Sequence, residues 1–159
     1  MRRPELPAEG GCRCGALRVR MTEPPMITSA CHCTGCQKMT GSAFSLTITL
    51  PASGLEVIRG ESVQGGLKGD EVTHHHCPDC LSWVFTTAKG LEGFVNLRAT
   101  MLDDPTWFEP FIELQTAERL PWVPPLAEHG FARFPDVTDY MALAADYAGH
   151  LDAKDRPPG

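Results

Sequence analysis

The seven cysteines of this 159-residue sequence fall into three short clusters. The clusters are Cys-x-Cys, Cys-x-Cys-x-x-Cys and Cys-x-x-Cys, formed by Cys12 and Cys14, by Cys31, Cys33 and Cys36, and by Cys77 and Cys80. Zinc takes four protein ligands in a closed structural site, whereas a catalytic zinc keeps three protein ligands and one open position. Seven thiols therefore divide into a set of four and a set of three, which predicts two zinc ions per chain.

The first and last clusters are expected to form the closed site. In "CPDC", Pro78 fixes the backbone of a tight turn that can direct the sulfurs of Cys77 and Cys80 to one ion. In "GGCRCG", the glycines around Cys12 and Cys14 allow the backbone to approach a metal closely. This set of four would link the N-terminal part of the chain to its middle, and its binding energy would contribute to folding.

The middle cluster supplies only three ligands, and the sequence leaves several readings of it open. It is a catalytic zinc site with an open position, a second structural site completed by a histidine, or a group of buried free thiols. The candidate histidines are His32 and the run His74, His75 and His76. In an extended segment His32 points away from its two cysteine neighbours, so we expect it to support the site from behind. The histidine run is typical of a strand with alternating exposed and buried side chains.

An open zinc site with three thiolates favours one kind of chemistry. Three thiolates donate charge strongly, which makes the ion a weak Lewis acid and argues against a hydrolase. A thiol that coordinates zinc is deprotonated, and the thiolate is the nucleophilic form. The open position would therefore hold a substrate thiol as its thiolate and present it to a small carbonyl compound. We expect Gly41 and Ser42, in "TGSAF", to shape the rim of this site, although such a segment is equally typical of a plain turn.

The elements that must position these cysteines are mainly β-strands. Alternating or β-rich segments predict strands at 16–21, 26–31, 44–50, 55–60, 71–77, 82–87, 93–100 and 111–116. Residues 65–70, "GGLKGD", predict the turn that joins the strands at 55–60 and 71–77. Residues 33–41 predict a short helical turn that ends at Gly41. Apolar residues at helical spacing predict one C-terminal helix at 137–151, capped by Asp136 or Thr138 and carrying Val137, Met141, Ala144, Ala145 and Ala148.

Composition and charge exclude several classes of protein. The net charge of −6 and the absence of a basic cluster larger than Arg2 and Arg3 argue against binding of nucleic acid. No apolar run is long enough to span a membrane, and no signal peptide is visible. A cytoplasmic location is therefore expected, where cysteines are metal ligands or reactive thiols and not disulfides. The expected organisation is a flexible lead-in at 1–9, one zinc-binding domain at 10–151 and a disordered tail at 152–159, with no indication of the oligomeric state.

Three segments together resemble the motifs of the glutathione-dependent formaldehyde-activating enzyme family, which also includes centromere protein V. They are "GGCRCGALRVR", "CHCTGCQKMTGSAF" and "HCPDC", followed by "ERLPW", and the resemblance covers about residues 10 to 123. It implies a mainly β, tent-like fold of stacked antiparallel sheets around a structural zinc, as in methionine sulfoxide reductase B. It also implies that Cys12, Cys14, Cys77 and Cys80 hold that zinc, and that Cys31, Cys33 and Cys36 hold a catalytic zinc.

The activity that the resemblance implies is that of a carbon–sulfur lyase, the reversible joining of glutathione and formaldehyde to S-(hydroxymethyl)glutathione. Two residues depart from the family pattern. Leu81 stands where the family usually has glycine, which predicts an altered turn, and Phe111 stands where it often has histidine, which predicts a changed pocket and a changed thiol specificity. The alternatives to an enzyme are a non-catalytic, zinc-stabilised binding module and a protein that buffers thiols or metal ions.

Overall fold

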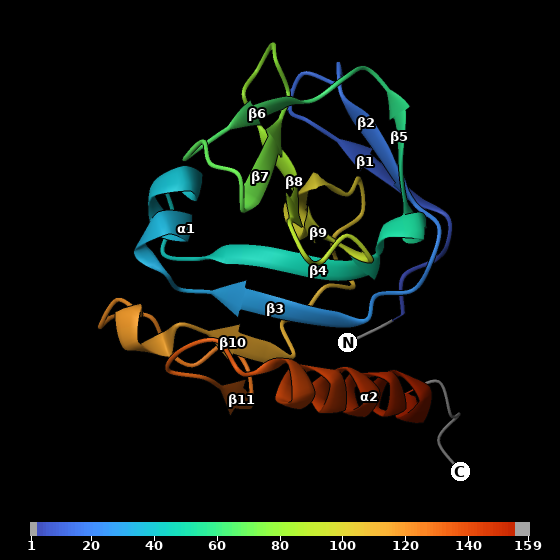
Figure 1. Ribbon diagram of the computed structural model, residues 1–159. Helices are drawn as coiled ribbons and strands as arrows, with labels where there is room; N and C mark the ends of the chain where they lie inside the picture. Colours follow the sequence, from blue (N-terminus) through green and yellow to red (C-terminus); the bar gives the residue numbers. More distant parts are fainter. Residues whose placement is uncertain (1–2, 155–159) are drawn as a thin grey trace. The chain divides into compact units, whose positions relative to one another are not determined.

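Short β-strands dominate residues 3–154, which are the residues that the computed structural model describes (Figure 1). Eleven strands lie in this part of the chain, together with two α-helices. The chain forms two compact units. Unit 1 comprises Met1–Pro4, Met26–Thr47 and Trp107–Gly159, and unit 2 comprises Glu5–Pro25 and Ile48–Thr106. The expectation of a mainly β fold with a C-terminal helix is confirmed.

Unit 1 carries the middle cysteine cluster on a strand and a short helix. Its strands follow the order β11-β10-β3-β4, and β10 pairs in parallel with both β3 and β11. These two pairings correct the expectation of antiparallel sheets for this part of the fold, while its mainly β character is as expected. The elements are β3 (Ile27–Cys31), α1 (Thr34–Thr40), the start of β4 (Ser45–Pro51), β10 (Ile112–Leu114), the 3-10 helix η3 (Thr116–Glu118), β11 (His129–Gly130) and α2 (Val137–Lys154).

Unit 2 carries the other two cysteine clusters. Three of its strands form an antiparallel sheet in the order β1-β2-β5, namely β1 (Ala8–Gly11), β2 (Arg18–Met21) and β5 (Leu55–Arg59). The others continue from the end of β4 in the order β4-β9-β8-β7-β6. These are β6 (Val63–Gly65), β7 (Val72–His76), β8 (Trp83–Ala88) and β9 (Phe94–Arg98), with 3-10 helices η1 (Ala52–Gly54) and η2 (Ala99–Met101).

Each of the eight predicted strands is present, but one predicted pairing is wrong. The strand at 55–60, observed as β5, pairs with β2, and the turn at 65–70 joins β6 to β7. Strands β1, β6 and β11 were not predicted because they have two to four residues and little apolar alternation. Strand β1 begins at Ala8, within the segment expected to be a flexible lead-in.

Helix α2 packs along β3 in unit 1 (Figure 1). The Asp136 carboxylate accepts a hydrogen bond from the amide of Asp139 at 2.9 Å, which confirms one of the two predicted caps. The helix runs to Lys154, three residues beyond the predicted end; residues 155–159 of the predicted tail lie outside the described residues.

The buried face of α2 differs from the predicted one. Tyr147 and Leu151 are buried, and they form a core with Ile27, Cys31, Ile112 and Leu114. Val137 and Met141, which were expected on the apolar face, are exposed. Alanines lie on several faces of this helix, so the sequence pattern fits more than one orientation. No helix in the described part of the chain is long and apolar enough to cross a bilayer.

Candidate metal centres

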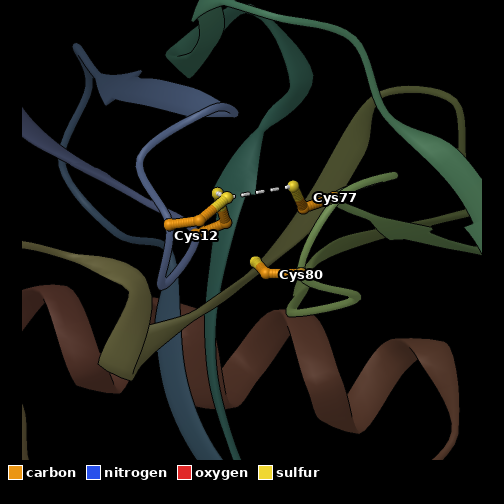
Figure 2. Close-up of side chains that lie close together, drawn as sticks. Cys12, Cys77 and Cys80 are labelled. Atoms are coloured by element: carbon orange, nitrogen blue, oxygen red, sulfur yellow. Dashed lines mark hydrogen bonds between the residues drawn. The ribbon is translucent and has the colours of Figure 1, made fainter.

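Four cysteines of unit 2 converge at one point, and we call them the tetrad. Cys12 and Cys14 follow strand β1, whereas Cys77 and Cys80 occupy the turn that leads from β7 to β8. Figure 2 shows the sulfurs of Cys12, Cys77 and Cys80 directed toward one another. All four sulfur atoms lie within 4.8 Å of each other. The predicted set of four is therefore brought together in space.

The spacing of the tetrad sulfurs fits a zinc ion. The sulfurs of Cys12 and Cys14 lie 3.5 Å apart, and those of Cys14 and Cys77 lie 3.8 Å apart. Four sulfurs at about 2.3 Å from a tetrahedral zinc are about 3.8 Å from one another. The tetrad therefore has the donor atoms and the separations of a closed four-thiolate site.

A glycine and one strained residue lie in the chain beside the two halves of the tetrad. A Cβ atom on Gly10 would lie 2.1 Å from the carbonyl oxygen of Met101, so only glycine fits there. Leu81 has a positive φ of 57°, which is unfavourable for a bulky side chain. Its amide donates to the carbonyl of Cys77 at 3.0 Å. This left-handed conformation is one that glycine adopts without strain.

Hydrogen bonds to sulfur favour the thiolate at two tetrad positions. The hydroxyl of Ser82 lies 3.2 Å from the sulfur of Cys80. Hydrogen bonds from this hydroxyl and from the Ser82 amide lower the pKa of Cys80 to about 5. Burial raises the pKa of Cys12, but hydrogen bonds from the Leu17 amide and from neighbouring thiols outweigh it, so the net pKa is lowered. The Ala16 amide favours the thiolate of Cys14, but bonds to the other thiols raise its pKa to about 12. The pKa is therefore lowered at Cys12 and Cys80 and raised at Cys14.

Three cysteines of unit 1 form a second cluster, which we call the triad. Cys31 is the last residue of β3, Cys33 caps the N-terminus of α1, and Cys36 lies in the first turn of that helix. The Cys33 sulfur accepts a hydrogen bond from the amide of Cys36 at 3.3 Å. The predicted helical turn and its end at Gly41, with φ 63°, are confirmed.

The triad has no fourth ligand from the described residues. Its three sulfurs lie within 4.8 Å of one another, and no histidine, aspartate or glutamate of residues 3–154 joins them at that distance. Cys31 is buried, and Cys33 and Cys36 are partly exposed. The hydrogen bond with Cys36 and burial raise the pKa of Cys31, and burial raises that of Cys33. The arrangement offers three sulfur donors to a metal ion.

His32 is not a ligand of the triad. Its side chain is fully buried, and its Nε2 atom lies 2.8 Å from a carboxylate oxygen of Glu113. Its Nδ1 atom has no hydrogen-bond partner among the described residues. Glu113 holds the ring, and the expected supporting role of His32 at the cluster stays a prediction. Sequence reasoning missed Glu113, which β10 places beside β3 and whose signal is a single acid inside the apolar run "FIEL".

The histidine run on β7 belongs to the sheet and not to a metal cluster of the described residues. His74 lies 3.0 Å from the hydroxyl of Thr86, and His75 stacks on Phe85 with ring centroids 4.2 Å apart. Burial lowers the pKa of both histidines. The register shifts between His75 and His76, so the side chains do not follow the predicted strict alternation.

Gly41 and Ser42 have local structural roles at the end of α1. The amide of Gly41 donates to the carbonyl of Gln37 at 2.9 Å, and the amide of Ser42 donates to the hydroxyl of Thr40 at 3.2 Å. Their contribution to a substrate site stays a prediction. Phe111, the second departure noted in the sequence, packs against Tyr147, His129 and His150.

One family model and one solved structure are similar to this chain. The sequence model of the family "Glutathione-dependent formaldehyde-activating enzyme" matches residues 7–118, which hold all seven cysteines. No curated protein matches the chain. Among solved structures, a crystal structure of a Rhodobacter sphaeroides protein is similar, with 17% identity and a TM-score of 0.49, over 77% of this chain and 97% of that one.

Proposed function

This chain belongs to the glutathione-dependent formaldehyde-activating enzyme family, and on that premise we propose that it is a zinc-dependent carbon–sulfur lyase. The proposed reaction reversibly joins a thiol, glutathione or a similar molecule, to formaldehyde or another small aldehyde. The tetrad would hold a structural zinc and the triad a catalytic one.

The observation that carries this proposal is the difference in the number of ligands. The tetrad offers the four sulfurs of a closed site, whereas the triad offers three and has no fourth ligand among residues 3–154. Three protein ligands with one open position are characteristic of catalytic zinc. The partial exposure of Cys33 and Cys36 supports the proposal that a small molecule reaches the cluster.

In the proposed reaction, Cys31, Cys33 and Cys36 would hold the metal, and its fourth position would be left for the substrate. A zinc ion bound there supplies the means of keeping the substrate thiol as its thiolate at neutral pH. The substrate sulfur forms a bond to the aldehyde carbon, the carbonyl double bond opens, and the thiol proton ends on the oxygen. The product is a hemithioacetal, no electrons are gained or lost overall, and the reverse reaction releases the aldehyde.

We propose that Gly41 and Ser42, which follow α1 and are exposed, contribute backbone and hydroxyl contacts at the rim of the site. The helix that precedes them carries Cys36 and is fixed at its start by the Cys33 cap. Holding the thiol and aldehyde together in the right orientation is the protein's main contribution, because thiols also add to formaldehyde without a catalyst.

The test combines zinc stoichiometry with an adduct-formation assay corrected for the uncatalysed rate. We expect two zinc ions per chain, one of which is released more readily when glutathione is added. The variant Cys33→Ala should retain one zinc and its fold but lose the catalysed rate. Lys38→Ala, an exposed position on the same helix, is the matched control and should behave as the wild type.

Other outcomes would overturn the lyase assignment in favour of the two alternatives. Two zinc ions that are inert to glutathione, with no rate above background, would indicate a zinc-stabilised binding module. One tightly held zinc together with three titratable thiols would indicate a thiol- or metal-buffering protein.

A further inference from the structure

We propose that two glutamates, Glu113 and Glu118, position the triad by holding the residues on either side of Cys33. The carboxylate of Glu113 contacts the ring of His32 at 2.8 Å, and the carboxylate of Glu118 accepts a hydrogen bond from the amide of Thr34 at 2.6 Å. These are the two chain neighbours of Cys33. The inference rests on that part of the proposed function which places a metal on the triad.

Every polar group of His32 except Nδ1 has a hydrogen-bond partner among the described residues. Its amide donates to the carbonyl of Leu114 at 2.9 Å, and its carbonyl accepts from the side-chain amide of Gln37 at 2.7 Å. Its ring contacts Glu113 through Nε2 and packs edge-on against Phe44. The residue between two triad cysteines is therefore fixed in position and in orientation.

The segment that follows β10 makes a third contact with the triad loop. The side-chain amide of Gln37 also donates to the carbonyl of Glu118 at 3.0 Å, so Gln37 bridges His32 and Glu118. Arg119 lies 3.5 Å from both carboxylate oxygens of Glu113. Residues 113–119 thus contact His32, Thr34 and Gln37, which lie on both sides of Cys33. We call these contacts the glutamate clamp.

Stability alone does not account for a buried acid and a buried histidine at this place. The side chains of His32 and Glu113 are 0% and 2% exposed. Apolar residues of similar volume often stabilise a protein as well as a buried polar pair does, because polar groups lose their hydration when they are buried. A directional contact has the advantage that it fixes geometry. Here it fixes the backbone between Cys31 and Cys33, and hence the directions in which their sulfurs point.

The clamp would matter most for an incomplete ligand set. A site with three protein ligands lacks the fourth sulfur that would otherwise help to hold the others in place. Partners that orient metal ligands typically change metal affinity by about 10–100-fold when they are removed. We therefore assign Glu113 and Glu118 a positioning role and no direct contact with substrate.

The test uses the whole chain with Co²⁺ or Zn²⁺ as the probe and replaces Glu113 in two ways. Glu113→Gln keeps the size and one hydrogen-bonding oxygen, and Glu113→Leu removes the hydrogen bond. We expect the affinity of the triad for metal to fall by about 10–100-fold in Glu113→Leu and by less in Glu113→Gln. The tetrad metal should be retained in both variants, which makes it an internal control.

Ile48→Val is the matched control, because it removes one buried methyl group at a residue outside the core cluster that contains Cys31. It should lower thermal stability slightly and leave the triad affinity and the sulfur-to-cobalt absorption band unchanged. A merely structural role of Glu113 predicts the same pattern for the Glu113 variants as for Ile48→Val. Unchanged triad affinity in a folded Glu113→Leu, or in Glu113→Gln if the leucine variant does not fold, would overturn the clamp.

The result also separates the clamp from the lyase proposal. Two metals in the wild type with a weakened triad in the Glu113 variants, but no catalysed rate, would support the clamp and overturn the lyase. A wild type that binds one metal even in excess Zn²⁺ would overturn both.

Discussion

The tetrad and the triad use the same ligand atom but assemble it in different ways. The tetrad joins two cysteine pairs from distant parts of the chain, with Cys14 and Cys77 separated by 63 positions. The triad draws its sulfurs from six consecutive residues at the end of β3 and the start of α1. A metal that closes a loop as long as the first removes about 4 kcal/mol of chain entropy from the unfolded state, by analogy with a disulfide. A metal at the triad closes almost no loop.

The two clusters also differ in the part of the chain that supplies their hydrogen-bond partners. Tetrad sulfurs receive hydrogen bonds from their own loop, from Leu17 and Ser82. Triad residues are held from a separate segment, through Glu113 and Glu118. A structural metal site needs ligands that bind the metal tightly. A site that exchanges one ligand also needs neighbouring residues that keep its remaining ligands in position. We therefore expect changes at the tetrad to affect folding and changes at the triad to affect binding.

The largest effect is expected from Cys77→Ala in the tetrad. Cys77 is fully buried, and structural zinc binding is worth roughly 10–16 kcal/mol in small zinc modules. Since total stability is about 5–15 kcal/mol, this variant should fail to fold. Circular dichroism and zinc content measure the outcome. A Cys77→Ala protein that stays folded and keeps two zinc ions would contradict the assignment of the tetrad as structural.

A chelator should separate the two clusters by the rate of zinc release. We expect two phases of equal amplitude, the faster one from the triad, because an incoming ligand can enter at its open position. Absorbance of a colorimetric chelator follows the release with time. In Cys33→Ala the fast phase should disappear and the slow phase should remain. Equal release rates would mean that the triad is as closed as the tetrad.

Leu81→Gly should stabilise the tetrad turn. The left-handed backbone of Leu81 costs roughly 1–2 kcal/mol, and glycine loses part of that gain to its greater freedom in the unfolded chain. A net gain of about 0.5–1 kcal/mol is expected, with a rise in melting temperature of about 1–4 °C. The control is Leu91→Gly, at an exposed leucine without a positive φ, which should not stabilise. A lower melting temperature for Leu81→Gly would show that the leucine side chain has a role of its own.

The smallest effect is expected from Glu118→Gln and depends on pH. The Thr34 amide, at the start of the triad helix, lowers the pKa of Glu118 below its ordinary value of about 4.3. A carboxylate with a lowered pKa adds stability above its unfolded pKa and loses it as the pH falls through the folded pKa. The wild type should therefore exceed the variant in stability at neutral pH, and the difference should disappear in acid. Denaturant unfolding at pH 7 and at the lowest pH at which both proteins keep their zinc measures it, and a difference that grows as the pH falls would contradict this role.

The cysteine clusters could be read from the sequence because zinc ligands have local spacing. Cys-x-Cys and Cys-x-x-Cys indicate a metal site whatever the rest of the fold does, and the number of thiols separated four from three. The end of α1 at Gly41 was also predictable, because glycine favours the left-handed conformation that stops a helix. The strands that precede the cysteines were predictable for a similarly local reason, because β-forming residues lie together within each segment.

What the sequence did not reveal depends on contacts between distant residues. Glu113 meets His32 across 81 positions, and the parallel pairing of β10 with β3 that brings them together leaves no local pattern. The pairing of β5 with β2 was missed because a nearer strand and an intervening turn suggested a hairpin. Alanines spread around α2 hid the face that Tyr147 and Leu151 bury. Local chemistry was thus predictable, and the long-range partners that support it were not.

The compact spacing of the triad has a consequence for synthesis of the chain. Cys36 is made 44 residues before Cys80, as the difference between 80 and 36 gives. At a translation rate of about 5–20 residues per second, the three triad thiols are complete roughly two to nine seconds before the tetrad is. During that interval, the nascent chain carries the complete triad while the tetrad of unit 2 still lacks Cys80.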